Sequence, residues 1–170
     1  MKKEIFKDME LAVDGIGLVI YSDEAMCHVE EGENYFENEF ATPEKVAEHI
    51  AKGDIVGFCT GTSGNYCIKV REGYPDSKLD EQFPISIRLA LNVKGNKISI
   101  IDLAWLMEWS PEIPPNQQIY VEEGIYHLTI LTRKPSSGMW GDNQIIYIFM
   151  NRLHEMPKLG WKGVPQLFTD

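Results

Sequence analysis

Carboxylates offer the most chemistry in this 170-residue chain, because 26 acidic residues stand against 16 lysines and arginines. A glycosidase needs two carboxylates and a calcium site needs several, so adjacent acids are candidates for both roles. Such pairs occur at Glu30-Glu31, Asp80-Glu81 and Glu122-Glu123. None has the alternate-position spacing of a calcium loop, and pairs arise readily in a chain this acidic. The acidic pairs therefore identify no reaction.

The histidines are spread along the chain rather than grouped. They are His28, His49, His127 and His154. Alternation over residues 125–132 places His127 on the outer face of a strand, and a general base needs a placed partner. Cys27 adjoins His28, but no second ligand pair follows at the short range typical of zinc sites. The sequence therefore predicts no catalytic residue, no metal and no cofactor.

The cysteines are odd in number, and nothing in the sequence indicates secretion, so reduced thiols are expected. They are Cys27, Cys59 and Cys67. Cys59 and Cys67 are displaced about equally from Ser63, the centre of a predicted turn at residues 61–65. A disulfide between these two cysteines is therefore the alternative.

Net charge is concentrated in one segment, residues 23–48, where nine acids are opposed only by Lys45. This stretch carries −8 of the formal net charge of −10. Such a field repels nucleic acid and anionic lipid and attracts a cationic partner. Tyr35, Phe36 and Phe40 lie among the acids and could either fix the segment to its own core or contact a partner. The predicted partner-binding residues are Glu30, Glu31, Glu33, Tyr35, Phe36, Glu37 and Glu39. A merely solvated face is the alternative.

These side chains need a scaffold, and the apolar pattern predicts one made mainly of strands. Apolar residues alternate over residues 84–93, the tripeptide 94–96 favours a turn, and residues 97–103 form the return strand of a predicted hairpin. Similar strand pairs are predicted at 10–13 with 16–21, 55–60 with 66–71, and 118–121 with 125–132, followed by a strand at 145–150. Short strands joined by turns predict an antiparallel β-sandwich.

One or two short helices complete the expected fold. Thr42 can cap a helix over residues 43–52, Pro43 suits its first turn, and Gly53 can end it. A second helical piece is expected at 102–109. We expect a single domain, residues 1–170, with the acidic segment 23–48 (including helix 43–52), a β core at 54–150 and an irregular C-terminal segment at 151–170.

Composition favours a soluble protein, because an apolar fraction of 44% is ordinary for a globular chain. No apolar run approaches the ~20 residues of a membrane-spanning helix. The start of the chain, residues 1–8, lacks the apolar stretch of a signal peptide. A cytoplasmic location and no membrane partner are expected.

A succession of short motifs resembles a known family. It comprises Phe83-Pro84-Ile85, then Ile98-Ser99-Ile100, then Val121-Glu122-Glu123-Gly124-Ile125-Tyr126-His127-Leu128. A Pro-containing strand followed by a Gly-x-Tyr strand is similar to small bacterial β-sandwich proteins of the competence nuclease-inhibitor type. The resemblance covers about residues 83–132. It implies an antiparallel sandwich and favours an inhibitor role, but it assigns no functional residue.

The charge and the resemblance favour a non-enzymatic protein-binding module, an immunity-type or inhibitor protein that neutralises a basic partner such as a nuclease. The first alternative is a small-molecule or carbohydrate-binding sandwich that uses Trp140 and Trp161 near the loop at 134–142. The second alternative is a hydrolase in which dispersed acids and His127 converge in the fold.

Overall fold

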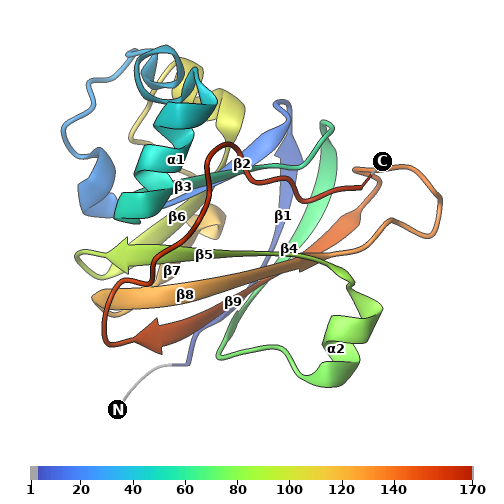
Figure 1. Ribbon diagram of the computed structural model, residues 1–170. Coiled ribbons are helices and arrows are strands. Elements are labelled where there is room, and N and C mark those ends of the chain that lie inside the picture. The colour runs from blue at the N-terminus through green and yellow to red at the C-terminus, as the bar shows by residue number, and fades with distance from the viewer. Residues whose placement is uncertain (1–3, 170) are drawn as a thin grey trace.

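The computed structural model describes residues 4–169, and the strands of this part of the chain form two sheets packed on one core (Figure 1). The larger sheet has the order β1 (Phe6–Val13), β4 (Gly64–Glu72), β9 (Gln144–Leu153), β8 (Gly124–Thr132) and β5 (Ile85–Val93). The smaller sheet has the order β3 (Ile55–Cys59), β2 (Gly17–Ser22), β6 (Lys97–Asp102) and β7 (Gln118–Tyr120). Neighbouring strands are antiparallel except β4 and β9, which are parallel. The predicted mainly β sandwich is confirmed.

The strands lie close to their predicted positions, but the predicted hairpins are wrong. β5 pairs with β8, from Ile85 opposite Thr132 to Val93 opposite Gly124, whereas β6 pairs with β2 and β7. The other three predicted pairs, β1 with β2, β3 with β4 and β7 with β8, also divide between the two sheets. A turn signal shows where the chain reverses, but it does not show whether the next strand joins the same ladder or crosses the core.

Residues 60–63 connect the smaller sheet to the larger sheet, and this connection separates two of the cysteines. Cys59 ends β3 in the smaller sheet, and Cys67 lies in β4 of the larger sheet. All three cysteines are free thiols, so the alternative of a Cys59–Cys67 disulfide is wrong.

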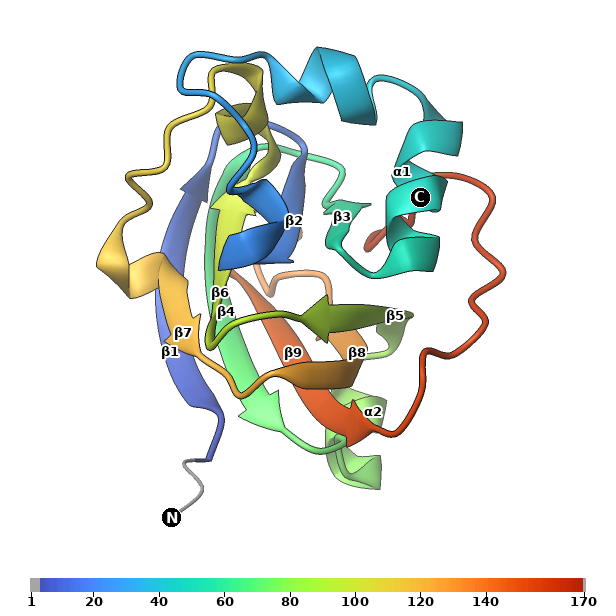
Figure 2. The ribbon, with the colours of Figure 1, turned by 90° about the vertical axis from the view of Figure 1, so that its left-hand side faces the viewer.

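β2 is buried on both faces, because every one of its residues is shielded from solvent. The larger sheet covers one face, and the chain between β2 and β3 covers the other (Figure 2). This chain contains η1 (Asp23–Met26), η2 (Phe36–Phe40) and α1 (Pro43–Lys52). Its two ends are close, since Tyr21 of β2 stands opposite Ile55 of β3. The acidic segment is therefore an excursion between two neighbouring strands.

α1 begins and ends as predicted. The hydroxyl of Thr42 accepts a hydrogen bond from the Lys45 amide at 3.3 Å, and Gly53 ends the helix with φ +69°. The second predicted helical piece is a 3₁₀ helix, η3 (Leu103–Met107), and another, η4 (Pro115–Gln117), precedes β7. α2 (Ser77–Gln82) was not predicted, although Asp76 caps it by accepting from the Leu79 amide at 2.8 Å.

The chain after β9 runs back along the sandwich without regular secondary structure. The Cys59 amide of β3 donates to the Pro165 carbonyl at 2.8 Å, and the Leu167 amide donates to the Cys59 carbonyl at 2.8 Å. Trp161 donates through Nε1 to the Arg88 carbonyl at 3.0 Å. The segment therefore covers the outer edge of β3. Among the described residues, no helix is long and apolar enough to cross a membrane, and the first three residues of the start considered above lie outside the described part.

Candidate functional site

Backbone hydrogen bonds fix the acidic segment to the sandwich. The Gly32 amide donates to the Trp109 carbonyl at 2.7 Å, and the Trp109 amide donates to the Glu33 carbonyl at 2.9 Å. The Trp109 ring is itself buried and lies edge-on to Tyr21 of β2, with 5.8 Å between ring centroids. The loop before η2 is therefore an ordered surface connected to the core.

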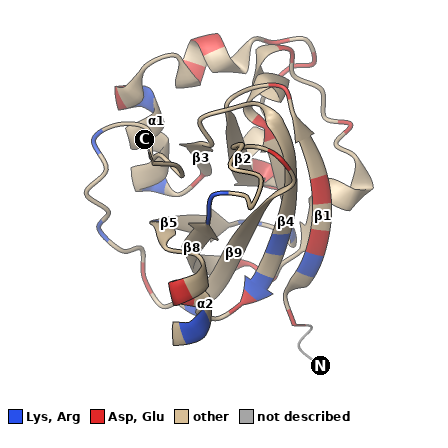
Figure 3. Ribbon diagram, turned by 90° about the vertical axis from the view of Figure 1, so that its right-hand side faces the viewer, with Lys and Arg blue, Asp and Glu red and all other residues tan. Residues whose placement is uncertain are grey.

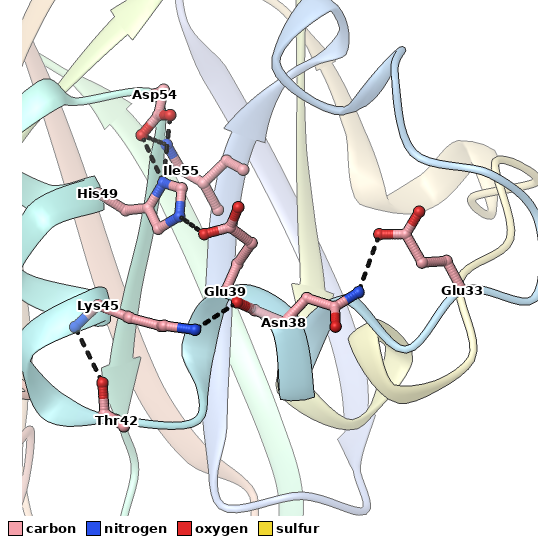
Figure 4. A network of polar contacts seen from close by, with 8 residues as sticks. All are labelled: Glu33, Asn38, Glu39, Thr42, Lys45, His49, Asp54 and Ile55. Carbon is pink, nitrogen blue, oxygen red and sulfur yellow. Dashed lines mark hydrogen bonds and ion pairs between the residues drawn. The ribbon is translucent and has the colours of Figure 1, made fainter.

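Polar contacts within the segment hold its turns (Figure 4). Asn34 Oδ1 accepts from the Glu37 amide at 3.0 Å, and Asn38 Nδ2 donates to Glu33 Oε2 at 3.5 Å. Lys45 Nζ donates to the Asn38 carbonyl at 2.7 Å. The only lysine of the segment therefore closes a turn, and among the described residues it forms no ion pair with the acids.

The structure divides the predicted partner-binding residues into surface and interior. Acidic residues follow one another along this segment in Figure 3. The exposed side chains are those of Glu30, Glu31 and Glu37, whereas Glu33, Phe36 and Glu39 are half-buried. Tyr35 is only 3% exposed, so it fixes the segment to the core, which is one of the two roles predicted for the aromatic residues of this segment. Its ring lies 6.0 Å from that of Phe40. Partner contact by the surface residues stays a prediction.

A histidine between two carboxylates joins the acidic segment to α1 and β3, and sequence reasoning missed it. His49 is 8% exposed, and its Nδ1 lies 3.1 Å from Asp54 Oδ1 while its Nε2 lies 3.3 Å from Glu39 Oε2 (Figure 4). Phe40 stacks on the imidazole at 5.2 Å and Tyr35 lies 6.2 Å away. A signal was present, because His49 adjoins Ile50 and lies three residues after Val46, and these two apolar residues mark the inward face of the helix.

The two carboxylates favour the charged form of this histidine. The hydrogen bond that His49 donates to the Asp54 carboxylate raises the pKa of His49 above 6.5, and Glu39 adds to this, although burial opposes it. Burial alone would raise the pKa of Asp54, but the His49 contacts and the Ile55 amide outweigh it and lower that pKa below 3.8. The contribution of this ion pair to stability is thus fully present only between the ordinary pKa values of the two groups, 3.8 for Asp54 and 6.5 for His49. It is lost as the pH rises through the folded pKa of His49.

Replacing His49 by glutamine is expected to lower the free energy of unfolding more at about pH 5.5 than at about pH 8.5. Because the folded pKa of His49 is raised above 6.5, the contribution of the imidazolium is fully present below 6.5 and declines as the pH rises through the folded pKa. Urea midpoints at the two pH values measure the difference. The matched control is His28→Gln, because His28 is exposed. Equal losses at both pH values for His49→Gln would show that the imidazole acts only as a neutral hydrogen-bonding group.

The other candidate residues do not converge on the acidic segment. His127 lies on the outer face of β8, where its Nδ1 is 3.0 Å from the Tyr74 hydroxyl, and burial lowers its pKa. The acidic pairs other than Glu30-Glu31 lie on α2 and before β8. Among residues 4–169, no group of three or more histidine, cysteine or acidic side chains is placed to hold a metal ion.

The two tryptophans of the carbohydrate alternative belong to different parts of the structure. Trp140 lies in the loop between β8 and β9, with Lys134 Nζ 6.0 Å from its ring centroid. Trp161 is held by the Arg88 carbonyl in the C-terminal segment. A pocket beside the 134–142 loop is lined by residues 133–136 and 142–145 and includes neither ring. The geometry therefore offers no stacking platform built from this pair.

The fold itself is that of known small β-sandwich proteins, one of which is an inhibitor. No protein-family model and no curated protein matches the sequence. The crystal structure of ComJ, inhibitor of the DNA degrading activity of NucA, from Bacillus subtilis, matches with a TM-score of 0.55 at 15% identity, over 90% of this chain and 99% of ComJ. A structure described as crocagin biosynthetic gene J matches with a TM-score of 0.52 at 11% identity, over 87% and 98% of the two chains. The resemblance predicted from residues 83–132 is confirmed for the fold, and it extends well beyond those residues.

Proposed function

We propose that this protein is a non-enzymatic binding module that inhibits a basic protein, such as a nuclease, by covering its cationic surface with the acidic segment 23–48. The observation that carries the proposal is a set of exposed carboxylates on an ordered surface. None of the following acids makes an ion pair with another described residue: Glu30, Glu31, Glu37, Glu44 and Glu48. Their charge is available to a partner.

Electrostatics and burial have separate roles in such a complex. A field of one sign increases the rate of encounter with a partner of opposite sign, and well-packed apolar groups at the centre slow dissociation. The hydrogen bonds to Trp109 reduce the entropy lost on binding, because the loop is already ordered. The fold shared with ComJ, an inhibitor of NucA, supports the same kind of role.

Inhibition is expected to be stoichiometric. Purified protein added to a basic nuclease should suppress DNA degradation as the two approach equimolar amounts, because a bound inhibitor blocks each active nuclease rather than turning over. The assay uses a panel of nucleases that comprises NucA and any basic nuclease encoded beside the gene of this protein. Inhibition should weaken as salt rises, since screening reduces the attraction.

Two controls separate inhibition from a trivial effect. Denatured protein at the same concentration tests whether net charge alone sequesters the nuclease, and excess DNA tests whether the protein acts on the substrate. Activity that is unchanged across the panel, together with no complex on size-exclusion chromatography at low salt, would contradict the proposed function.

A further inference from the structure

An apolar pocket lies between η2, α1 and the C-terminal segment. Its volume is about 300 Å³, and its lining includes Phe36, Phe40, Val46, Phe58, Leu103 and Val164. Ile16 also lines the pocket and is 55% exposed, while Val164 is 39% exposed. Ile16 and Val164 thus expose apolar surface to solvent, whereas Phe40, Val46 and Phe58 of the same lining are buried. Concave apolar surface of this kind marks a binding site.

Acids outnumber bases among the residues that flank the pocket lining along the chain. In the described part of the chain, the residues that line it include no lysine or arginine. Two exposed acids adjoin lining residues along the chain, as Phe36-Glu37 and as Pro43-Glu44, and the exposed Asp14 lies two positions before Ile16. The bases at the same range are Lys45, next to Val46, and Lys162, two positions before Val164. η2 contributes both to the pocket, through Phe36 and Phe40, and to the acidic surface, through Glu37. The apolar hollow is thus continuous with the acidic segment.

We propose that the pocket receives one aromatic or aliphatic side chain from a lysine- or arginine-rich segment of the partner, an inference that rests on the proposed function. The volume is at the lower end for small-molecule sites and suits a single inserted side chain. The acidic surroundings disfavour anionic ligands and favour an apolar residue flanked by cations. A buried apolar residue surrounded by polar contacts is the usual arrangement at the energetic centre of a protein interface.

Short peptides test this inference on the full chain. The first probe is acetyl-Lys-Lys-Phe-Lys-Lys-amide, in which an apolar side chain is flanked by cations. In the second probe serine replaces phenylalanine, in the third glutamate replaces every lysine, and the fourth is N-acetylphenylalanine amide. Binding is measured by titration of amide signals in ¹⁵N-correlated NMR spectra, with the signals of Phe36, Gly57 and Val164 reporting on the pocket. The first probe is expected to shift these signals and to bind at least about fivefold more tightly than the other three.

Charge-neutral variants of the lining provide the second measurement. The double variant Ile16→Gln, Val164→Thr is expected to weaken binding of the first probe by about fivefold, because both changes remove apolar contact at exposed positions. Met139→Gln is the matched control, since Met139 is 67% exposed and lies in the loop between β8 and β9, outside the pocket lining. Thermal unfolding of each variant verifies that the fold is retained.

The outcomes separate this inference from the proposed function. Equal binding of the phenylalanine and serine peptides, with shifts at Glu30 and Glu31 but none at Gly57 and Val164, would overturn the pocket assignment and leave the acidic surface in its proposed role. Binding of the neutral amide as tight as that of the basic peptide would assign the pocket to free small molecules and overturn the inference. Failure of both basic peptides to bind anywhere would count against the proposed function as well.

Discussion

Replacing Tyr35 by alanine is expected to lower the free energy of unfolding by about 3–4 kcal/mol, because the change leaves a cavity where a buried aromatic ring packs against Phe40 and His49. Equilibrium unfolding in urea measures the loss. The effect should be accompanied by loosening of the acidic segment, since Tyr35 immediately precedes η2. Faster hydrogen exchange at the amides of residues 30–40 would show this loosening directly.

Tyr35→Phe is the matched control for this prediction. It keeps the ring and removes only the hydroxyl, whose pKa is raised by burial and by the nearby Glu39, so the group is neutral in the folded protein at ordinary pH. We expect this variant to unfold within about 1 kcal/mol of the wild type. An alanine variant of unchanged stability that fails to bind a partner would instead make Tyr35 a contact residue.

Neutralising three exposed acids is expected to slow association with a basic partner by roughly tenfold at low salt. The variant Glu30→Gln, Glu31→Gln, Glu37→Gln removes charge from the acidic segment and retains side-chain size. Glu33 is left intact, because its carboxylate accepts from the Glu30 amide at 3.4 Å and from Asn38. Stopped-flow association rates over a range of salt concentrations measure the effect, and the dependence on salt should become shallower.

A second triple variant controls for net charge alone. Asp80→Asn, Glu81→Gln and Glu123→Gln remove the same charge from exposed positions on α2 and before β8. α2 lies at the opposite end of the molecule from α1 (Figure 1). Equal slowing by both triple variants would show that overall charge attracts the partner and that the acidic segment has no special place in the complex.

Strand positions could be predicted here far better than strand partners. Alternation of apolar residues in β5 records that one face is buried, and the turn at Gly95 records that the chain reverses. Neither property records which strand lies alongside, because β5 and β6 bury apolar faces in either arrangement. The pairing of β5 with β8 depends on contacts between residues more than 30 positions apart, which no local pattern contains.

The candidate site was predictable to a similar extent. Clustering of charge in residues 23–48 is visible in the sequence, and the exposed positions of Glu30, Glu31 and Glu37 agree with a surface segment. The inward position of Tyr35 depends on how η2 turns, and the contact between His49 and Glu39 depends on how η2 sits against α1. Local composition could not show either, because each arises from packing between elements.

The placement of the acidic segment between β2 and β3 bears on how this scaffold could acquire other specificities. Tyr21 and Ile55 are cross-strand partners, so the intervening chain begins and ends at almost the same point of the sheet. Loops closed in this way tolerate changes in length and composition at small entropic cost, provided that the flanking strands are retained. A different excursion between the same two strands would therefore leave the sheets in register only if it supplied apolar side chains in place of Phe40, Val46 and Ile50, which are buried against the core.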